Sequence, residues 1–117
     1  MRVIVCGGRG YADGPTVVNT LGNMNITTLA HGGAPGADEL ARVFALMAGI
    51  PTTEFPARWG EHGKAAGPIR NQRMLDEFKP DAVVAFPGGR GTADMVRRAT
   101  ASGVRVILIA PSAEGSP

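Results

Sequence analysis

The amino-acid sequence predicts a single Rossmann-like three-layer α/β sandwich built on a five-stranded parallel sheet in the order 3-2-1-4-5. Short apolar runs rich in β-branched residues alternate with segments of helical periodicity, which is the pattern of a parallel sheet covered on both faces. Glycine-rich turns follow three of the runs, where strands pass into helices. A chain of 117 residues is long enough for one such domain.

Five apolar runs predict the strands. The first, RVIVC, begins almost at the amino terminus, and the third, PTTEF, is short and expected at an edge of the sheet. Right-handed crossovers and doubly wound topology place strands 1 and 4 side by side at the centre. The expected strands are residues 2–6, 26–30, 51–55, 81–86 and 104–110.

Four helices are expected between the strands. The clearest follows the second glycine loop and ends at Gly49, because four apolar residues recur at the i, i+3, i+4, i+7 spacing of one helix face. Those residues are Leu40, Val43, Phe44 and Met47. The other helices are expected at about 15–23, 68–78 and 92–102, with a long loop before the helix at 68. In that helix, the candidates for the buried side are Ile69, Met74, Leu75 and Phe78.

We expect residues 1–110 to form the domain and residues 111–117 a flexible tail. The longest apolar run is far too short to span a membrane, and the first strand leaves no room for a signal segment, so we expect a cytoplasmic protein. A single cysteine excludes an internal disulfide and fits a reducing compartment. Cys6 is interpreted as a small buried residue, with a reactive thiol as the alternative.

The charged residues indicate a small anionic ligand. The net charge is only +2, but most of the cations are arginines, which suit bidentate recognition of phosphate or carboxylate. Several of them lie in or beside glycine-containing loops, namely Arg9, Arg70, Arg73 and Arg90. We expect no nucleic-acid partner, because the sequence shows neither a basic stripe nor a recognisable nucleic-acid module. No membrane partner is expected either.

Two loops share the sequence Gly-Gly-Arg-Gly, and the predicted topology brings them together. One follows strand 1 and the other strand 4, so both lie at the crevice where the winding direction of the chain reverses. Such turns present backbone N–H groups beside the positive end of a helix dipole, which makes them phosphate cradles. The alternative is that the glycines serve tight turns only. The candidate ligand-binding residues here are Gly7, Gly8, Arg9, Pro87, Gly88, Gly89, Gly91 and Thr92.

A third glycine loop, HGGAPGAD, contributes Gly32, Gly33 and Asp38 to the same crevice. Asp38 is expected in the first turn of the following helix, where it either complements the helix dipole or contacts a ribose or amine. Arg70 and Asn71 are expected in the first turn of the helix at 68, where a cation is poorly placed unless an anion lies nearby. Both are therefore candidate ligand contacts.

Trp59 and the two histidines complete the set of candidate functional residues. Trp59, in the long loop, either stacks on a base or packs beneath the loop. His31 and His62 lack the spacing of a metal site, so we expect no metal and no cofactor. Neither of the two Gly-Gly-Arg-Gly loops matches the dinucleotide-binding fingerprint or the P-loop motif.

The segments HGGAPGAD, GPIRNQRM and PGGRGTADM resemble those of the YspA-like family of the SLOG superfamily. That superfamily includes the Lonely Guy phosphoribohydrolases, once labelled lysine decarboxylases, and nucleotide-sensing domains of bacterial defence systems. The resemblance runs from residue 2 to about residue 110. It implies a Rossmann-like sheet that binds a nucleotide or a nucleotide derivative, and a homo-oligomer.

The chain departs from the catalytic pattern of the Lonely Guy enzymes, P-G-G-x-G-T-x-x-E and R-K-x-x-M. Met95 stands where that resemblance places a catalytic Glu, and Asn71 replaces the Lys. A thioether can neither exchange a proton nor stabilise a developing oxocarbenium ion. The leading hypothesis is therefore a nucleotide-binding sensor, carrier or sequestering protein. The alternative is a hydrolase that cleaves a nucleotide N-glycosidic bond with another acid, such as Asp38 or Asp94.

Overall fold

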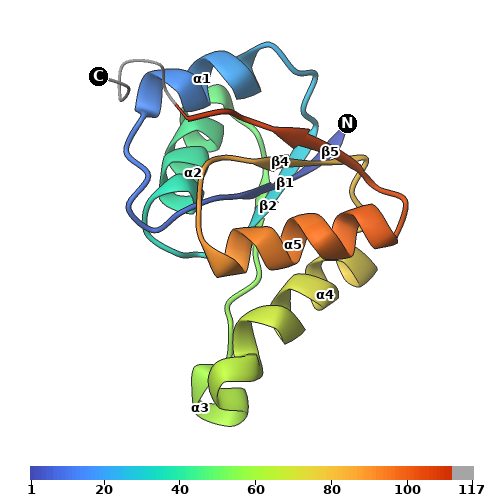
Figure 1. Cartoon of the computed structure of the whole chain (residues 1–117). Helices are drawn as coiled ribbons and strands as arrows, with labels where there is room; N and C mark the ends of the chain where they lie inside the picture. The colour runs from blue at the N-terminus through green and yellow to red at the C-terminus, as the bar shows by residue number, and fades with distance from the viewer. Residues whose placement is uncertain (112–117) are drawn as a thin grey trace.

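The computed structural model describes residues 1–111 and contains the predicted five-stranded parallel sheet, in the order β3-β2-β1-β4-β5 (Figure 1). β1 and β4 pair side by side at its centre, with Ile4 opposite Val83. The fold class and the strand order predicted from the sequence are thereby confirmed. The strands are β1 (Arg2–Cys6), β2 (Thr28–His31), β3 (Thr52–Glu54), β4 (Ala82–Ala85) and β5 (Arg105–Leu108).

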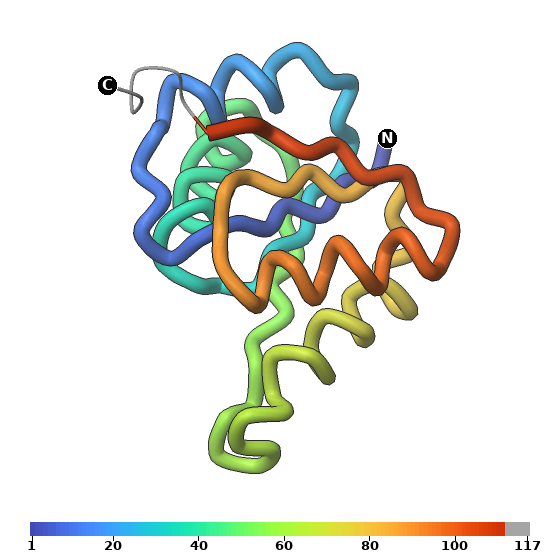
Figure 2. Tube along the Cα trace, in the orientation of Figure 1, coloured from blue at the N-terminus to red at the C-terminus, as the bar shows by residue number. Residues whose placement is uncertain are grey.

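Two pairs of helices cover the two faces of the sheet (Figure 1). One face is covered by α1 (Gly14–Gly22) and α2 (Ala37–Ala48), and the other by α4 (Ala66–Phe78) and α5 (Arg90–Ala101). Between β3 and α4, the short helix α3 (Trp59–His62) and the 3-10 turn η1 (Gly63–Ala65) project away from the sheet, as the trace in Figure 2 shows.

The core consists of two apolar clusters, one on each side of the sheet. Val3 and Val5 face α1 and α2, whereas Ile4, between them, packs against α4 and α5. This alternation follows from the two-residue period of a strand. All four residues of β4 are buried, as expected for a strand at the centre of a parallel sheet.

The local signals at helix ends are conventional. Asp13 caps α1, because its carboxylate accepts a hydrogen bond from the N–H of Thr16 at 3.1 Å. α2 ends where Gly49 adopts the left-handed conformation, with φ of 72°.

The apolar periodicity that predicted α2 does not mark its buried face. The side of α2 that packs on the sheet carries alanines, and Ala41 and Ala45 are completely buried. Val43 and Met47 are instead 40% and 84% exposed. Leu40 and Phe44 pack at the margin of the core. Small side chains allow the helix axis to approach the sheet closely, so the larger residues are left on the outer side.

Two helices begin earlier than the sequence predicts. α4 starts at Ala66, which places Arg70 and Asn71 in its second turn rather than its first. Pro68 did not mark the first helical residue, because a proline is tolerated anywhere in the first turn, where its missing N–H has no intrahelical partner. α5 starts at Arg90, so Gly91 lies within the helix and not in the loop. Ile69, expected on the buried side of α4, is 45% exposed.

The expected tail at 111–117 lies outside the described residues except for Pro111. Among residues 1–111, no helix combines the length and the apolar character needed to cross a membrane.

Candidate functional site

The three glycine loops meet at the carboxyl ends of the central strands. The N–H of Gly8 donates to the carbonyl of Pro87 at 2.9 Å, which joins the two Gly-Gly-Arg-Gly loops. The carbonyl of Gly8 accepts from the N–H of Ala37 at 3.1 Å, which joins the first loop to the start of α2. Both polar backbone groups of Gly8 are thus engaged within the protein.

The glycines of these loops fall into two groups. Gly7, Gly36 and Gly88 are required by close packing, because a Cβ at each would collide with a neighbouring loop; at Gly7 it would lie 2.5 Å from the Cβ of Ala37. Gly89 and Gly91 are different, since a Cβ there would meet nothing within 4 Å. Tight packing therefore explains part of the repeat, while the second loop also leaves backbone facing open space.

That open space is a cavity of about 450 Å³ beyond the carboxyl ends of β1 and β4. The chain winds in opposite directions on the two sides of this strand pair, so the cavity lies at the switch point of the sheet. Its walls come from all three loops, from α4 and from the α3 segment. The residues predicted from the sequence that line it are Gly7, Gly8, Arg9, Gly32, Gly33, Asp38, Arg70, Asn71, Gly89, Gly91 and Thr92. Pro87 and Gly88 instead line a shallower cavity between α5 and the end of β5.

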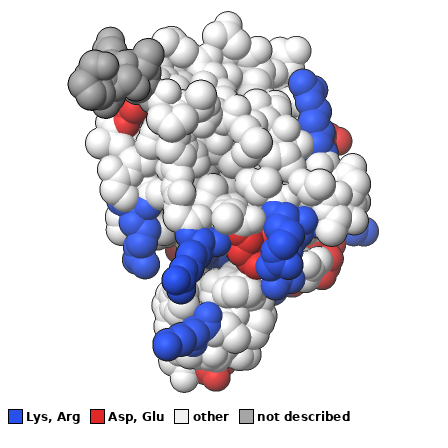
Figure 3. Space-filling model, in the orientation of Figure 1, with Lys and Arg blue, Asp and Glu red and all other residues white. Residues whose placement is uncertain are grey.

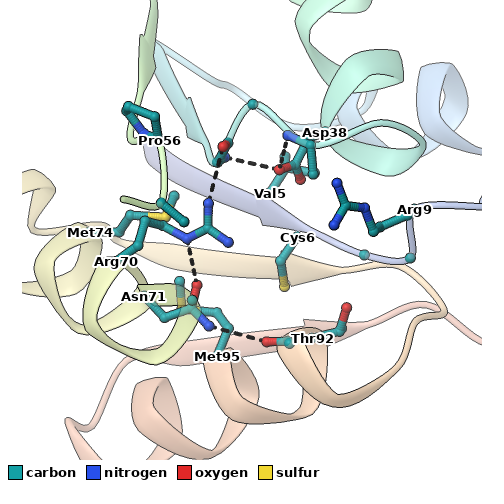
Figure 4. A pocket seen from close by; sticks show the side chains of 18 of the residues that line it. Val5, Cys6, Arg9, Asp38, Pro56, Arg70, Asn71, Met74, Thr92 and Met95 are labelled. Atoms are coloured by element: carbon teal, nitrogen blue, oxygen red, sulfur yellow. Dashed lines mark hydrogen bonds between the residues drawn. The ribbon is translucent and has the colours of Figure 1, made fainter. Parts of the chain in front are cut away.

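Arg70 reaches into the cavity from α4 with its orientation fixed. Its Nη1 donates to the carbonyl oxygens of Gly32 at 3.0 Å and Phe55 at 3.2 Å, and its Nε donates to Oδ1 of Asn71 at 3.0 Å. Nη2 has no hydrogen-bond partner among residues 1–111, and Figure 4 shows it pointing toward Cys6. The held guanidinium therefore offers one free edge to a ligand.

Asn71 is buried and joins α4 to α5. Besides accepting from Arg70, its amide donates through Nδ2 to the carbonyl of Gly91 at 3.1 Å and to Oδ2 of Asp94 at 3.0 Å. Its amide group is occupied on both sides. Asn71 therefore positions Arg70 and the first turn of α5, rather than offering a free group to a ligand.

The amino end of α5 faces the cavity without a side-chain cap. The first i→i−4 bond of α5 runs from Ala93 to the carbonyl of Gly89 at 3.0 Å, so the N–H groups of Arg90, Gly91 and Thr92 precede it. The hydroxyl of Thr92 turns back toward Gly88. Uncapped N–H groups at the positive end of a helix dipole are suited to an anion.

Asp38 is buried in the first turn of α2 and holds the third loop in shape. Its Oδ2 accepts from the N–H groups of Gly32 at 3.0 Å and Ala34 at 3.2 Å. Burial raises the pKa of this carboxyl, while the two N–H donors, His31 and Arg70 act in the opposite direction. Its Oδ1 has no hydrogen-bond partner among residues 1–111, so a contact to a ligand is compatible with the structural role.

His31 lies at the end of β2, not in the loop as expected, and is buried. Its Nδ1 accepts from the N–H of Gly33 at 3.0 Å. Within residues 1–111, no group of three or more His, Cys, Asp or Glu residues is arranged to hold a metal ion.

Two sulfur-containing side chains form part of the cavity wall. Cys6 ends β1 at the cavity, and burial raises its pKa to about 12. Cys6 is partly buried, and its thiol is protonated at neutral pH, which disfavours the alternative of a reactive thiol. Met95, on α5, lines the same cavity while packing in the core below it.

Asp94, one residue before Met95, does not line the cavity. Its carboxylate accepts hydrogen bonds from Asn71 and, at 2.8 Å, from Nε of Arg98, and it pairs with Arg97. Burial acts to raise the pKa of Asp94, but these donors lower it overall. Figure 3 shows the basic side chains gathered over α5 with acidic ones between them. Asp94 is thus a poor candidate for the acid of a hydrolase.

Trp59, for which the sequence left base stacking and packing beneath the loop as alternatives, lines the cavity. Several other lining residues were not among the predicted contacts, including Ala34, Glu54, Pro56, Ala57, Gly67, Met74 and Arg90. Glu54 could have been found, because it ends β3 at the same edge of the sheet as the glycine loops. Pro56 and Ala57, which lead into α3, could not, since the sequence predicted a loop there without a pattern that selects them.

Comparison with known proteins places the chain in a family. A profile of the YspA, cpYpsA-related SLOG family matches residues 1–62, which is more than half of the chain. The chain belongs to this SLOG family. The SLOG chain is also 36% identical to the Gene 61 protein of Mycobacterium phage D29, over 91% of this chain and 94% of the phage protein.

Solved structures similar to this SLOG chain support the fold alone. MurG of Acinetobacter baumannii matches with a TM-score of 0.55 at 15% identity, over 97% of this chain and 37% of MurG. UDP-GlcNAc 2-epimerase of Neisseria meningitidis, bound to UDP-GlcNAc, matches with a TM-score of 0.53 at 19% identity, over 93% of this chain and 32% of the epimerase. The SLOG chain thus spans about a third of the length of these two proteins.

Proposed function

We propose that this protein binds a nucleotide or a nucleotide-derived small molecule and acts as a sensor, carrier or sequestering protein. The observation that carries the proposal is that the free edge of Arg70 and the uncapped amino end of α5 face one cavity at the switch point of the sheet. A phosphate fits between them, because both present N–H donors and positive charge. The base or sugar then lies toward Gly7, Gly8, Gly33 and Asp38.

Arg9 and Thr92 add to the phosphate end. Arg9 comes from the first glycine loop and lines the cavity opposite Arg70 (Figure 4). The hydroxyl of Thr92 lies at the amino end of α5. Because the cavity also contains the carboxylates of Asp38 and Glu54, it has acceptors for the hydroxyl or amino groups of a nucleoside as well as donors for a phosphate.

A substitution at Gly89 tests the phosphate site. A leucine at this position has room for its Cβ and keeps an ordinary φ of −102°, so Gly89→Leu should fold while its side chain blocks the amino end of α5. We expect calorimetry to show binding of nucleoside monophosphates by the parent and none by this variant. Mass spectrometry of small molecules carried through purification would identify the natural ligand.

The matched control is Gly10→Leu in the first Gly-Gly-Arg-Gly loop. Gly10 also has open space for a Cβ, but it does not line the cavity. This variant should bind as the parent does. Equal affinity of parent and Gly89→Leu would contradict the placement of the phosphate, and absence of nucleotide binding by the parent would contradict the proposed function.

A second candidate is hydrolysis of a nucleotide N-glycosidic bond, and Asp38 favours it. A buried carboxyl with a raised pKa, one oxygen of which has no hydrogen-bond partner among residues 1–111, is a candidate general acid. Product analysis separates the candidates: an intact nucleotide supports binding, whereas free base and ribose phosphate support hydrolysis. If the parent releases base, Asp38→Asn should stop the release.

We further propose that the protein is a cytoplasmic homo-oligomer. In support, Val43, Leu46 and Met47 form an exposed apolar stripe on the outer side of α2, at the spacing of one helix face. Light scattering should give a mass above that of one chain, and Leu46→Glu should lower it. A monomeric parent would contradict the proposal.

A further inference from the structure

Trp59 lies in the cavity wall with much of its surface uncovered. It begins α3, lines the cavity and is 54% exposed. One edge of the indole rests over Gly67, where a Cβ would be 3.4 Å from Cη2. The backbone of α4 thus supports the ring from one side and leaves most of it open.

The segment that carries Trp59 has no core of its own. Neither α3 nor η1 contains a buried residue, and Figures 1 and 2 show the segment projecting from the sheet beside the amino end of α4. Of its side chains, Trp59 alone offers a large apolar surface. An indole in this position gains further burial from a ligand that enters the cavity or from a second molecule that covers it, and its place in the cavity wall favours the ligand.

We infer that Trp59 is a stacking platform for a planar ring, so that the ligand class is a nucleoside phosphate rather than a sugar phosphate or inorganic phosphate. This inference rests on the proposed function, because it assumes that the phosphate end of the same ligand lies at α5. Indole faces stack on all bases without needing hydrogen bonds to their edges. Trp59 therefore confers preference for nucleosides over ligands that lack a base.

The protein carries its own reporter for this inference, because Trp59 is the only tryptophan. Stacking of a base on the indole should quench its fluorescence. Titration with AMP and GMP should give saturable quenching, whereas ribose 5-phosphate and inorganic phosphate should give none. Binding of the same four compounds would be measured in parallel by calorimetry, which does not depend on the indole.

Replacing Trp59 tests the contribution of the ring. Stacking of one base on an aromatic side chain corresponds to about 5- to 150-fold in affinity, so Trp59→Ala should weaken AMP binding by a factor in that range. Trp59→Phe should retain part of the affinity for AMP that stacking contributes. The affinity for ribose 5-phosphate should be the same in parent and Trp59→Ala, which a merely structural role of the indole would not produce. Val18→Ala, at a residue of 52% exposure on the far side of the sheet, is the control and should bind as the parent does.

The outcomes distinguish this inference from the proposed function. If AMP binds by calorimetry but neither quenches Trp59 nor loses affinity in Trp59→Ala, the stacking platform is wrong and the nucleotide site stands. A fluorescence change that follows protein concentration without nucleotide would show that Trp59 contacts a second copy instead, which also overturns the inference. If no nucleotide binds at all, the proposed function itself fails.

Discussion

At the scale of single residues, Arg70 has the most fully defined geometry in the site. Two carbonyls and one amide hold its guanidinium, and one amino group remains for a ligand. The sequence analysis selected Arg70 because a cation in the first turn of a helix implies an anion nearby. The structure places it in the second turn, so that premise was wrong. The fixed orientation of its guanidinium is the better reason to regard Arg70 as a ligand contact.

We predict that Arg70→Ala weakens binding of AMP by about ten- to a hundredfold, which is the loss of one charge-assisted contact. Arg70→Lys should give an intermediate loss, because an ammonium group lacks the planar fork that spans Gly32 and Asn71. Calorimetry measures both. Arg73→Ala, one turn along α4 and outside the cavity wall, should leave affinity unchanged. Unaltered binding by Arg70→Ala would remove this residue from the site.

Cys6 gives a prediction about reactivity and pH. With its pKa raised by burial from 9.0 to about 12, the thiolate fraction near pH 8 is about 1,000-fold smaller than that of an unperturbed thiol. Alkylation of the folded protein by iodoacetamide should therefore be slow and should rise about tenfold per pH unit well beyond pH 9. In denaturant, the rate of alkylation should equal that of free cysteine. It should level off above about pH 9, because the unperturbed thiol is then ionised. Fast alkylation of the folded chain near pH 8 would contradict the raised pKa of this thiol.

At the scale of elements, the glycines of the second Gly-Gly-Arg-Gly loop differ in their tolerance of a side chain. A Cβ at Gly88 would lie 2.7 Å from the N of Gly8, which is backbone and cannot move cheaply. A Cβ at Gly91 would meet nothing. The two glycines therefore differ in what surrounds them. Gly88 is required by the close packing of two loops, whereas Gly91 faces open space beside the end of a helix.

We predict that Gly88→Ala lowers the free energy of unfolding by about 1–3 kcal/mol, as expected for overpacking. Gly91→Ala should leave it unchanged or raise it by up to about 1 kcal/mol, because alanine restricts the unfolded chain and favours the helix. Denaturant unfolding of the two variants is the measurement. Equal stability of both would mean that the loops do not interlock as described.

The sequence was sufficient for the sheet but not for every helix. Alternating apolar runs and glycine turns determine strand order, because few topologies satisfy right-handed crossovers. They do not reveal which side of α2 is buried, since packing against a flat sheet favours its alanines over its larger residues. They also missed α3, a single turn with no buried residue and thus no apolar period to detect.

At the scale of the whole molecule, the site is a consequence of topology. The carboxyl ends of β1, β2 and β4 meet at one edge, so residues far apart in the sequence line one cavity. This is why candidate residues could be selected from the sequence wherever they follow a strand. The roles of Asn71 and Asp38 could not, because they depend on hydrogen bonds between separate elements, such as the bond from Asn71 to Gly91.

We predict that the protein does not hydrolyse nucleoside monophosphates at a useful rate, because Met95 lies in the cavity wall where the family resemblance places a catalytic Glu. A positioned acid-base group contributes about 10² to 10⁴ in rate, and a thioether supplies none of it. Asp94 cannot substitute, since it faces away from the cavity and is paired with Asn71 and Arg98.

The measurement is release of free base from AMP, GMP, CMP and UMP, followed by chromatography for the parent and for Met95→Glu. The parent should release none, and Met95→Glu should release base if Arg70 and the amino end of α5 are still in place. Met95 is 1% exposed, so the new carboxylate carries a cost of burial, and Met95→Gln serves as the control that matches its shape without its charge. Release by Met95→Glu and not by Met95→Gln would show that one side chain separates a binding protein from a hydrolase on this fold. Rapid release by the parent would instead assign the chemistry to one of the two carboxyls that line the cavity, Asp38 and Glu54, and Asp38→Asn and Glu54→Gln would distinguish them.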